Sequence, residues 1–170
     1  MSKILLEAIN LKKTYEHING NITLFNNINL KIKHGDLIAL VGPSGSGKSS
    51  LLHLIALLDD PTMGKILINN KETKNLDADQ KDEIRRKNIS IIFQDNNLLT
   101  DFTALENVMM PLLIKGENKK NILSKAKKIL KDVKILNRSD HFPSELSGGE
   151  QQRVAIARAL IAGTNLILAD

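Results

Sequence analysis

The sequence Gly42-Pro43-Ser44-Gly45-Ser46-Gly47-Lys48-Ser49 decides the fold of this 170-residue chain. It matches the phosphate-binding loop pattern G-x-x-x-x-G-K-[ST]. Residues 37–41 precede it as a continuous apolar run and predict a strand buried on both faces. Residues 48–58 follow it and predict a helix. A glycine- and serine-rich turn before a helix is the simpler alternative, but the flanking strand and helix favour a phosphate site.

The residues of this loop suit the chemistry of phosphate binding. Glycines let the backbone turn tightly, so that its N–H groups can point at phosphate oxygens. The start of the following helix adds unsatisfied donors and a partial positive charge. The Lys48 amine can reach terminal phosphates and the Ser49 hydroxyl can bind Mg²⁺. The loop therefore predicts nucleotide binding.

Hydrophobic periodicity along the rest of the chain predicts an α/β fold with a parallel core. Residues 89–93 and 166–169 are further buried-strand candidates, and the patterns at 4–9, 22–33 and 65–68 predict more strands. Helices are expected at 77–87, 103–113 (limited by Pro111), 122–133 and 147–161. In the third of these helices, lysines occupy the face opposite the apolar residues, which is typical of a solvated helix face.

Two further segments carry polar residues suited to a nucleotide site. The apolar run 166–169 ends in Asp170, a position from which phosphate-loop proteins hold magnesium. The segment Leu146-Ser147-Gly148-Gly149-Glu150 places a serine and two glycines at a helix start, which can bind an anion. A plain serine cap, with Glu150 completing a capping box, is the alternative. Two phosphate-binding helix starts in one chain suggest that one nucleotide lies between two subunits.

The amino-acid composition limits the classes of protein and of partner that fit this sequence. The chain has 42% hydrophobic and 25% charged residues, which is typical of one soluble globular domain. It has no cysteine, which excludes a disulfide scaffold. The net charge of +5 is modest and aromatic residues are only 3%, so a nucleic-acid partner is not expected. No apolar run approaches the roughly 20 residues of a membrane span, and no signal peptide is recognised.

Together these motifs resemble the nucleotide-binding subunit of ABC transporters, and the resemblance covers essentially the whole chain. It implies a single nucleotide-binding domain over residues 1–170, ATP and Mg²⁺ as ligands, and two copies that close head-to-tail on integral membrane subunits. The implied nucleotide contacts are Tyr15 on the base, Gly42, Pro43, Ser44, Gly45, Ser46, Gly47, Lys48, Ser49 and Ser50 on the phosphates, and Gln94. Ser147, Gly148 and Gly149 would reach the nucleotide of the other copy, and Ser49, Gln94 and Asp170 would position Mg²⁺.

Two segments indicate which subfamily of ABC transporters the sequence resembles most. Residues 98–114 and 141–145 resemble the ATP-binding subunits of lipoprotein-releasing transporters. Macrolide and peptide exporters share a looser version of both segments and remain the alternative. The resemblance implies a peripheral protein at the cytoplasmic face of the inner membrane.

The end of the sequence departs from the family pattern. Family members place a catalytic glutamate directly after the residue that matches Asp170, so no general base is assigned in this chain. The family's next strand would lie between residues 166–169 and 37–41, and its absence would leave backbone groups unpaired. The sequence is therefore expected to be a domain truncated after the magnesium-binding strand and to fold poorly alone. A non-hydrolysing ATP-binding remnant is the second alternative.

Overall fold

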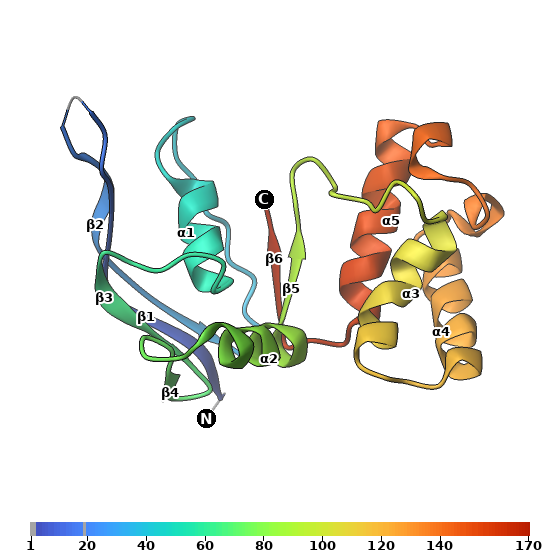
Figure 1. Cartoon of the computed structure of the whole chain (residues 1–170), viewed down its shortest axis with the longest axis horizontal. Coiled ribbons are helices and arrows are strands. Elements are labelled where there is room, and N and C mark those ends of the chain that lie inside the picture. Colours follow the sequence, from blue (N-terminus) through green and yellow to red (C-terminus); the bar gives the residue numbers. More distant parts are fainter. Residues whose placement is uncertain (1–2, 19) are drawn as a thin grey trace. The chain divides into compact units, whose positions relative to one another are not determined.

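A computed structural model describes residues 3–18 and 20–170. It divides into two compact units, Met1–Arg85 and Arg86–Asp170, and each is described by itself. The first holds β1 (Ile4–Tyr15), β2 (Ile22–Lys33), α1 (Lys48–Ile55), β3 (Met63–Ile68), β4 (Lys71–Glu72) and most of α2 (Ala78–Asn88). The second holds β5 (Ile89–Ile92), α3 (Ala104–Ile114), α4 (Lys119–Asp132), α5 (Gly148–Ile161) and β6 (Leu166–Ala169), with 3-10 turns at Leu136–Arg138 and Pro143–Glu145 (Figure 1).

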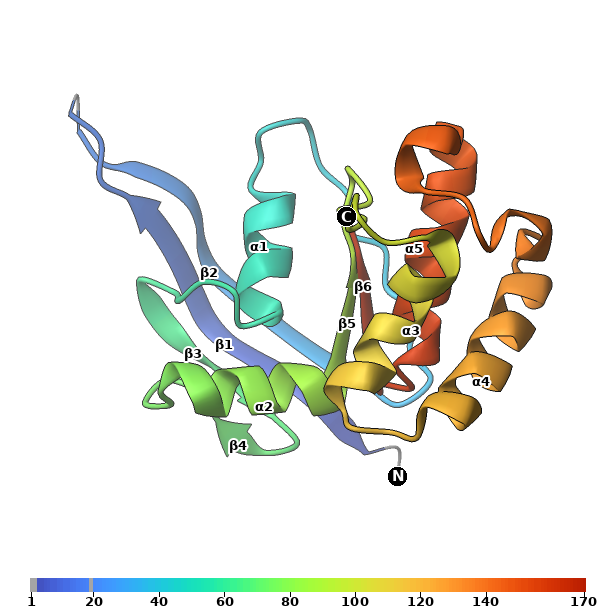
Figure 2. The ribbon, with the colours of Figure 1, turned by 45° about the vertical axis from the view of Figure 1, so that its right-hand side comes forward.

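The first unit is built on an antiparallel sheet with the order β2-β1-β3-β4. The long strand β1 is central and pairs with β2 on one side and β3 on the other (Figure 2). Its buried residues include Leu6, Ala8 and Leu11, whose apolar side chains form much of the core of this unit. The antiparallel pairing was not predicted, although the bounds of β2 were.

The segment 37–41 differs from its prediction. It has no regular secondary structure and joins neither sheet among the described residues, and Leu37 and Val41 are 101% and 86% exposed. The prediction of a strand buried on both faces is therefore wrong for this structure. An apolar run favours burial but does not itself supply the neighbouring strands that a ladder requires.

Two helix ends also differ from prediction. Helix α1 ends at Ile55 rather than at residue 58, because Leu57 adopts a left-handed conformation with φ +57°. Pro111 lies inside α3 and does not end it, since the Lys115 N–H still donates to the Pro111 carbonyl at 3.3 Å. Proline removes only its own N–H from the helix ladder, so the following turn remains possible.

In the second unit, β5 and β6 form a parallel pair in which Ile89 lies opposite Leu166 and Ile92 opposite Ala169. This confirms two of the three predicted strands of the parallel core. β6 is only partly buried, because Ile167 is 42% exposed. Among the described residues, no helix is both long and apolar enough to cross a membrane.

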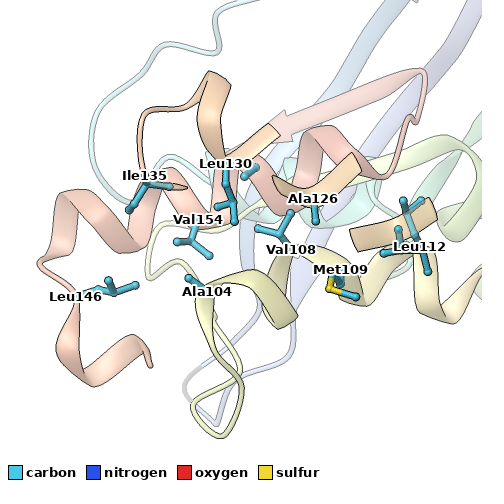
Figure 3. Packing of buried hydrophobic residues seen from close by; sticks show 11 residues of the cluster. Ala104, Val108, Met109, Leu112, Ala126, Leu130, Ile135, Leu146 and Val154 are labelled. Atoms are coloured by element: carbon cyan, nitrogen blue, oxygen red, sulfur yellow. The ribbon is translucent and has the colours of Figure 1, made fainter. Parts of the chain in front are cut away.

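Helices α3, α4 and α5 pack around one apolar core. Figure 3 shows Val108, Leu130 and Val154, each from a different helix, directed into this cluster. All three are fully buried. The predicted lysine-rich helix is confirmed as α4, whose buried residues are Ile122, Ala126 and Leu130.

We expect Leu130→Ala to lower the free energy of unfolding by about 2–5 kcal/mol, because it leaves a cavity between three helices. The matched control is Leu123→Ala on the same helix, where the side chain is 38% exposed and the expected loss is about 0.5 kcal/mol. Urea unfolding measures both. Equal losses would contradict this description of the core.

Candidate nucleotide-binding site

The phosphate loop turns through two glycines in the left-handed region. Gly45 has φ +78° and Gly47 has φ +88°, and the Ser46 N–H donates to the Pro43 carbonyl at 3.3 Å. Gly47 is the N-cap residue of α1 and has no side chain with which to cap the helix. The first turn of α1 also lacks an acidic residue. The first N–H groups of α1 and its partial positive charge thus suit an anionic ligand.

Gly47 is required by close packing as well as by its backbone conformation. A Cβ at this position would lie 3.1 Å from Cδ1 of Phe25 and 3.2 Å from Cβ of Leu24, both on β2. A Cβ on Gly42 would lie 2.9 Å from the Ser46 hydroxyl oxygen. Glycine at both positions lets the loop close on itself and against β2.

The Lys48 amine is held at the loop. Its Nζ atom donates to the carbonyl oxygens of Gly42 at 2.9 Å and Pro43 at 2.8 Å. The lysine charge therefore lies beside the same loop that presents the backbone donors. Ser49 and Ser50 follow on the half-buried first turn of α1. Backbone donors, a lysine charge and two hydroxyl residues at one loop fit the phosphates of a nucleotide.

Tyr15 lies at the end of β1 and is 43% exposed. Its hydroxyl donates to Oδ2 of Asp59 at 3.1 Å. Burial alone would raise the pKa of Asp59, but hydrogen bonds from Lys13, the Asp60 N–H and Tyr15 outweigh it and hold this pKa below its ordinary value of 3.8. Asp59 is thus an ionised acceptor at neutral pH. Sequence patterns missed Lys13 and Asp59, because 46 residues separate them along the chain.

In the second unit, the sheet brings Gln94 and Asp170 to one edge. β5 and β6 run parallel, and Gln94 follows the end of β5 as Asp170 follows the end of β6. The Asp170 N–H donates to the Ile92 carbonyl at 3.0 Å, which fixes the end of β6 beside β5. Both side chains belong to exposed residues.

The segment after Gln94 is held by two side chains that sequence patterns did not single out. The Arg158 guanidinium donates to the carbonyls of Asn96 and Asn97, each at 2.7 Å. Burial lowers the pKa of Arg158. Asn107 is fully buried and accepts from the Leu99 N–H at 2.8 Å. The sequence signal for this arrangement was weak, since single Arg and Asn residues in helices have many roles.

Ser147 caps α5 as the simpler reading of its segment predicted. Its hydroxyl oxygen accepts from the Glu150 N–H at 3.4 Å, and the Ser147 N–H donates to Oε2 of Glu150 at 2.8 Å. Hydrogen bonds from the Ser147 backbone and hydroxyl, then from Arg138, lower the pKa of Glu150. Gly148 and Gly149 form the exposed first turn. The side-chain bonds of the capping box join Ser147 and Glu150 and do not involve the two glycines.

The predicted residues thus form two groups. Tyr15 and the loop 42–50 belong to the first unit, and Gln94, Asp170 and residues 147–149 belong to the second. Among the described residues, no group of three or more His, Cys, Asp or Glu side chains could hold a metal ion. Mg²⁺ sites that use one or two side chains together with substrate phosphates do not require such a cluster.

The glycine-rich loop that precedes α1 has the sequence and the helix-start geometry of a phosphate-loop nucleotide-binding protein. A family model described as ABC transporter matches residues 25–170. The chain therefore belongs to the ABC transporter family, as an ATP-binding subunit.

Individual relatives agree with this assignment. The chain is 46% identical over 167 residues to the lipoprotein-releasing system ATP-binding protein LolD of Wigglesworthia glossinidia brevipalpis, which covers 98% of this chain and 73% of that protein. Two solved structures of the ATP-binding cassette MJ0796 are each 42% identical, with a TM-score of 0.93. Both cover 98% of this chain and 73% of theirs, and both are dimers, one in a post-hydrolysis state bound to ADP and Pi.

We expect Gly47→Ala to lower stability more than Gly45→Ala. Both changes force a side chain into the left-handed region, at about 1–2 kcal/mol. Only the Gly47 change also drives a Cβ against Leu24 and Phe25, because a Cβ on Gly45 meets nothing within 4 Å among the described atoms. Urea unfolding of the two variants compares them directly. A smaller loss for Gly47→Ala would show that β2 does not constrain the loop.

Proposed function

We propose that this chain is the ATP-binding subunit of an ABC transporter that uses ATP hydrolysis to release lipoproteins from the inner membrane. Nucleotide binding rests on one observation above the others: α1 begins at the left-handed Gly47 without a side-chain cap, and such a helix start suits phosphate oxygens. The choice of lipoproteins rests on the 46% identity to a LolD protein across 98% of the chain.

The proposed roles of the binding residues follow from their chemistry. The loop N–H groups and Lys48 hold the β- and γ-phosphates, with Lys48 exchanging its carbonyl partners for phosphate oxygens. Ser50 lies near the α-phosphate, and the Tyr15 ring stacks on the base. Ser49, Gln94 and Asp170 position Mg²⁺, which neutralises charge on the phosphates when bound. Positioning and charge stabilisation would then carry most of the catalysis, while no residue of this sequence is assigned as the general base that activates water.

We infer that Gly148 and Gly149 meet the nucleotide of a second copy. Each glycine in a helix costs about 0.5–1 kcal/mol relative to alanine. Packing within the described chain does not require glycine at these positions, since a Cβ on either residue meets no other atom within 4 Å. A backbone left bare at an exposed helix start suits close approach by a ligand from outside. Ser147, at the same turn, would reach the γ-phosphate, and the closed pair would be head-to-tail.

The proposed membrane partner would contact the second unit near α3. Leu99, Phe102 and Ile114 are exposed apolar residues in or beside this helix, with exposures of 41%, 39% and 62%. They lie in the segment 98–114 that suggested lipoprotein release. Docking there would place the subunit on integral membrane partners, as a peripheral protein at the cytoplasmic face of the inner membrane. Nucleic acid is not proposed as a partner.

Depletion of the protein in its source cells tests the proposed cargo. We expect lipidated proteins to accumulate in the inner membrane, because ATP hydrolysis no longer drives their release. Membrane fractionation followed by detection of lipoproteins measures this. Normal lipoprotein distribution together with increased sensitivity to macrolides or peptides would instead support the exporter alternative.

Alanine at the two glycines tests the contact with a second copy. We expect Gly148→Ala and Gly149→Ala each to raise stability slightly, by no more than the roughly 0.5–1 kcal/mol that alanine gains over glycine in a helix interior. The same changes should abolish ATP-dependent dimer formation, measured by light scattering with Mg²⁺ and ATP. The matched control is Ser124→Ala, which also introduces an alanine at an exposed helical position but lies on α4, outside this turn. Unimpaired dimerisation in the first two variants would contradict the proposed contact.

A further inference from the structure

A buried lysine lies on β1, two residues before the tyrosine proposed to stack on the base. Lys13 is only 8% exposed. Its Nζ atom donates to Oδ1 of Asp59 at 2.8 Å and to the Asp60 carbonyl at 2.9 Å, and it lies 2.7 Å from Oδ2 of Asp59. A buried ammonium group requires such partners, because desolvation disfavours its charge.

The Lys13–Asp59 pair also fixes the ring of Tyr15. The side chains of Lys13 and Tyr15 both reach Asp59, although the pairing of β1 with β2 is irregular between Lys13 and Thr14. Nζ of Lys13 lies 4.7 Å from the centroid of the Tyr15 ring, in a cation–π contact. The Tyr15 hydroxyl donates to the same Asp59 carboxylate. The Tyr15 ring is therefore positioned by two contacts: Asp59 binds its hydroxyl, and the Lys13 amine lies over one face of the ring.

We propose that Lys13 and Asp59 are positioning residues for the nucleobase: they hold the Tyr15 ring so that its second face receives the base. This inference rests on the proposed stacking role of Tyr15. The lysine occupies one face of the ring, so a base stacks on the opposite face. Asp59 follows shortly after α1, so the segment that begins with the phosphate loop also carries the anchor of the base-binding tyrosine.

A purely structural role would be to attach the segment after α1 to β1. Other bonds already do so. The Thr62 N–H donates to the Lys12 carbonyl at 2.9 Å, and the Thr14 N–H donates to the Thr62 hydroxyl at 3.0 Å. Asp59→Asn keeps the side-chain shape and leaves both of these bonds in place. This variant therefore removes the charge that orients Tyr15 without removing the attachment.

The test compares two ligands that differ in whether they carry a base. Affinities for ATP and for inorganic tripolyphosphate, each with Mg²⁺, are measured for the chain and its Asp59→Asn, Lys13→Met and Lys13→Arg variants. Stacking on an aromatic ring is worth about 1–3 kcal/mol per base. We therefore expect the first two variants to weaken ATP binding roughly three- to tenfold and to leave tripolyphosphate binding within about twofold. Lys13→Arg keeps a cation over the ring and should restore much of the ATP affinity.

Fluorescence gives a second, independent readout. Tyr15 is the only tyrosine and the chain has no tryptophan, so intrinsic emission in this region reports on this ring alone. We expect ATP to change the emission of the wild-type chain, and the change to shrink in Asp59→Asn. The matched control is Glu72→Gln, which removes an exposed ion pair with Lys65 in the same unit and should alter neither readout.

Each outcome decides the proposal. Equal losses for ATP and tripolyphosphate would assign Lys13 and Asp59 a structural role and overturn it, as would unchanged ATP affinity in both variants. Tyr15→Ala separates the two hypotheses: if it leaves ATP affinity unchanged, stacking by Tyr15 fails and the positioning role fails with it. If Tyr15→Ala weakens ATP binding and Asp59→Asn and Lys13→Met do not, only the positioning role fails.

Discussion

The left-handed turn at Gly47 is the constraint on which the rest of the nucleotide site depends. It lets α1 begin without a side-chain cap, so the partial positive charge at the start of this helix suits an anionic ligand. Glycine suits this position, because a Cβ there would lie only 3.1 Å from Phe25 and 3.2 Å from Leu24 of β2 and would be strained by the left-handed conformation. The antiparallel sheet thus supports the loop directly, and Lys48 closes it by donating to the carbonyls of Gly42 and Pro43.

The second unit positions its polar residues by a different combination of interactions, an apolar helical core and hydrogen bonds to the segments that leave it. Its helices share one fully apolar core around Val108, Leu130 and Val154. Polar bonds then fix the segments that leave this core: Arg158 holds the carbonyls after Gln94, and the capping box of Ser147 fixes the start of α5. Both segments carry proposed ligand contacts at exposed positions. The hydrogen bonds that hold these segments come from other residues of the second unit and not from a ligand.

Local signals predicted much of this arrangement. The spacing of Ile122, Ala126 and Leu130 predicted the amphipathic helix α4, and the alternating pattern gave the bounds of β2. Ser147 with Glu150 predicted a capping box, which is present. These features depend on neighbours within four residues, or on the two-residue period of a strand, and sequence patterns report such neighbours well.

Features that depend on distant partners could not be predicted in the same way. The run 37–41 is apolar enough for a buried strand, yet burial requires adjacent strands that the pattern does not specify. The pairing of β1 with both β2 and β3 is also non-local. Lys13 reads in sequence as an ordinary strand lysine, and only the fold reveals its bond to Asp59.

NMR of the ¹⁵N-labelled chain, titrated with ATP and Mg²⁺, shows whether the backbone from Gly45 to Ser50 binds nucleotide phosphates. We expect the largest changes in amide shift on this loop and the first turn of α1. Saturable binding with unchanged loop amides, or no binding at all, would contradict this expectation.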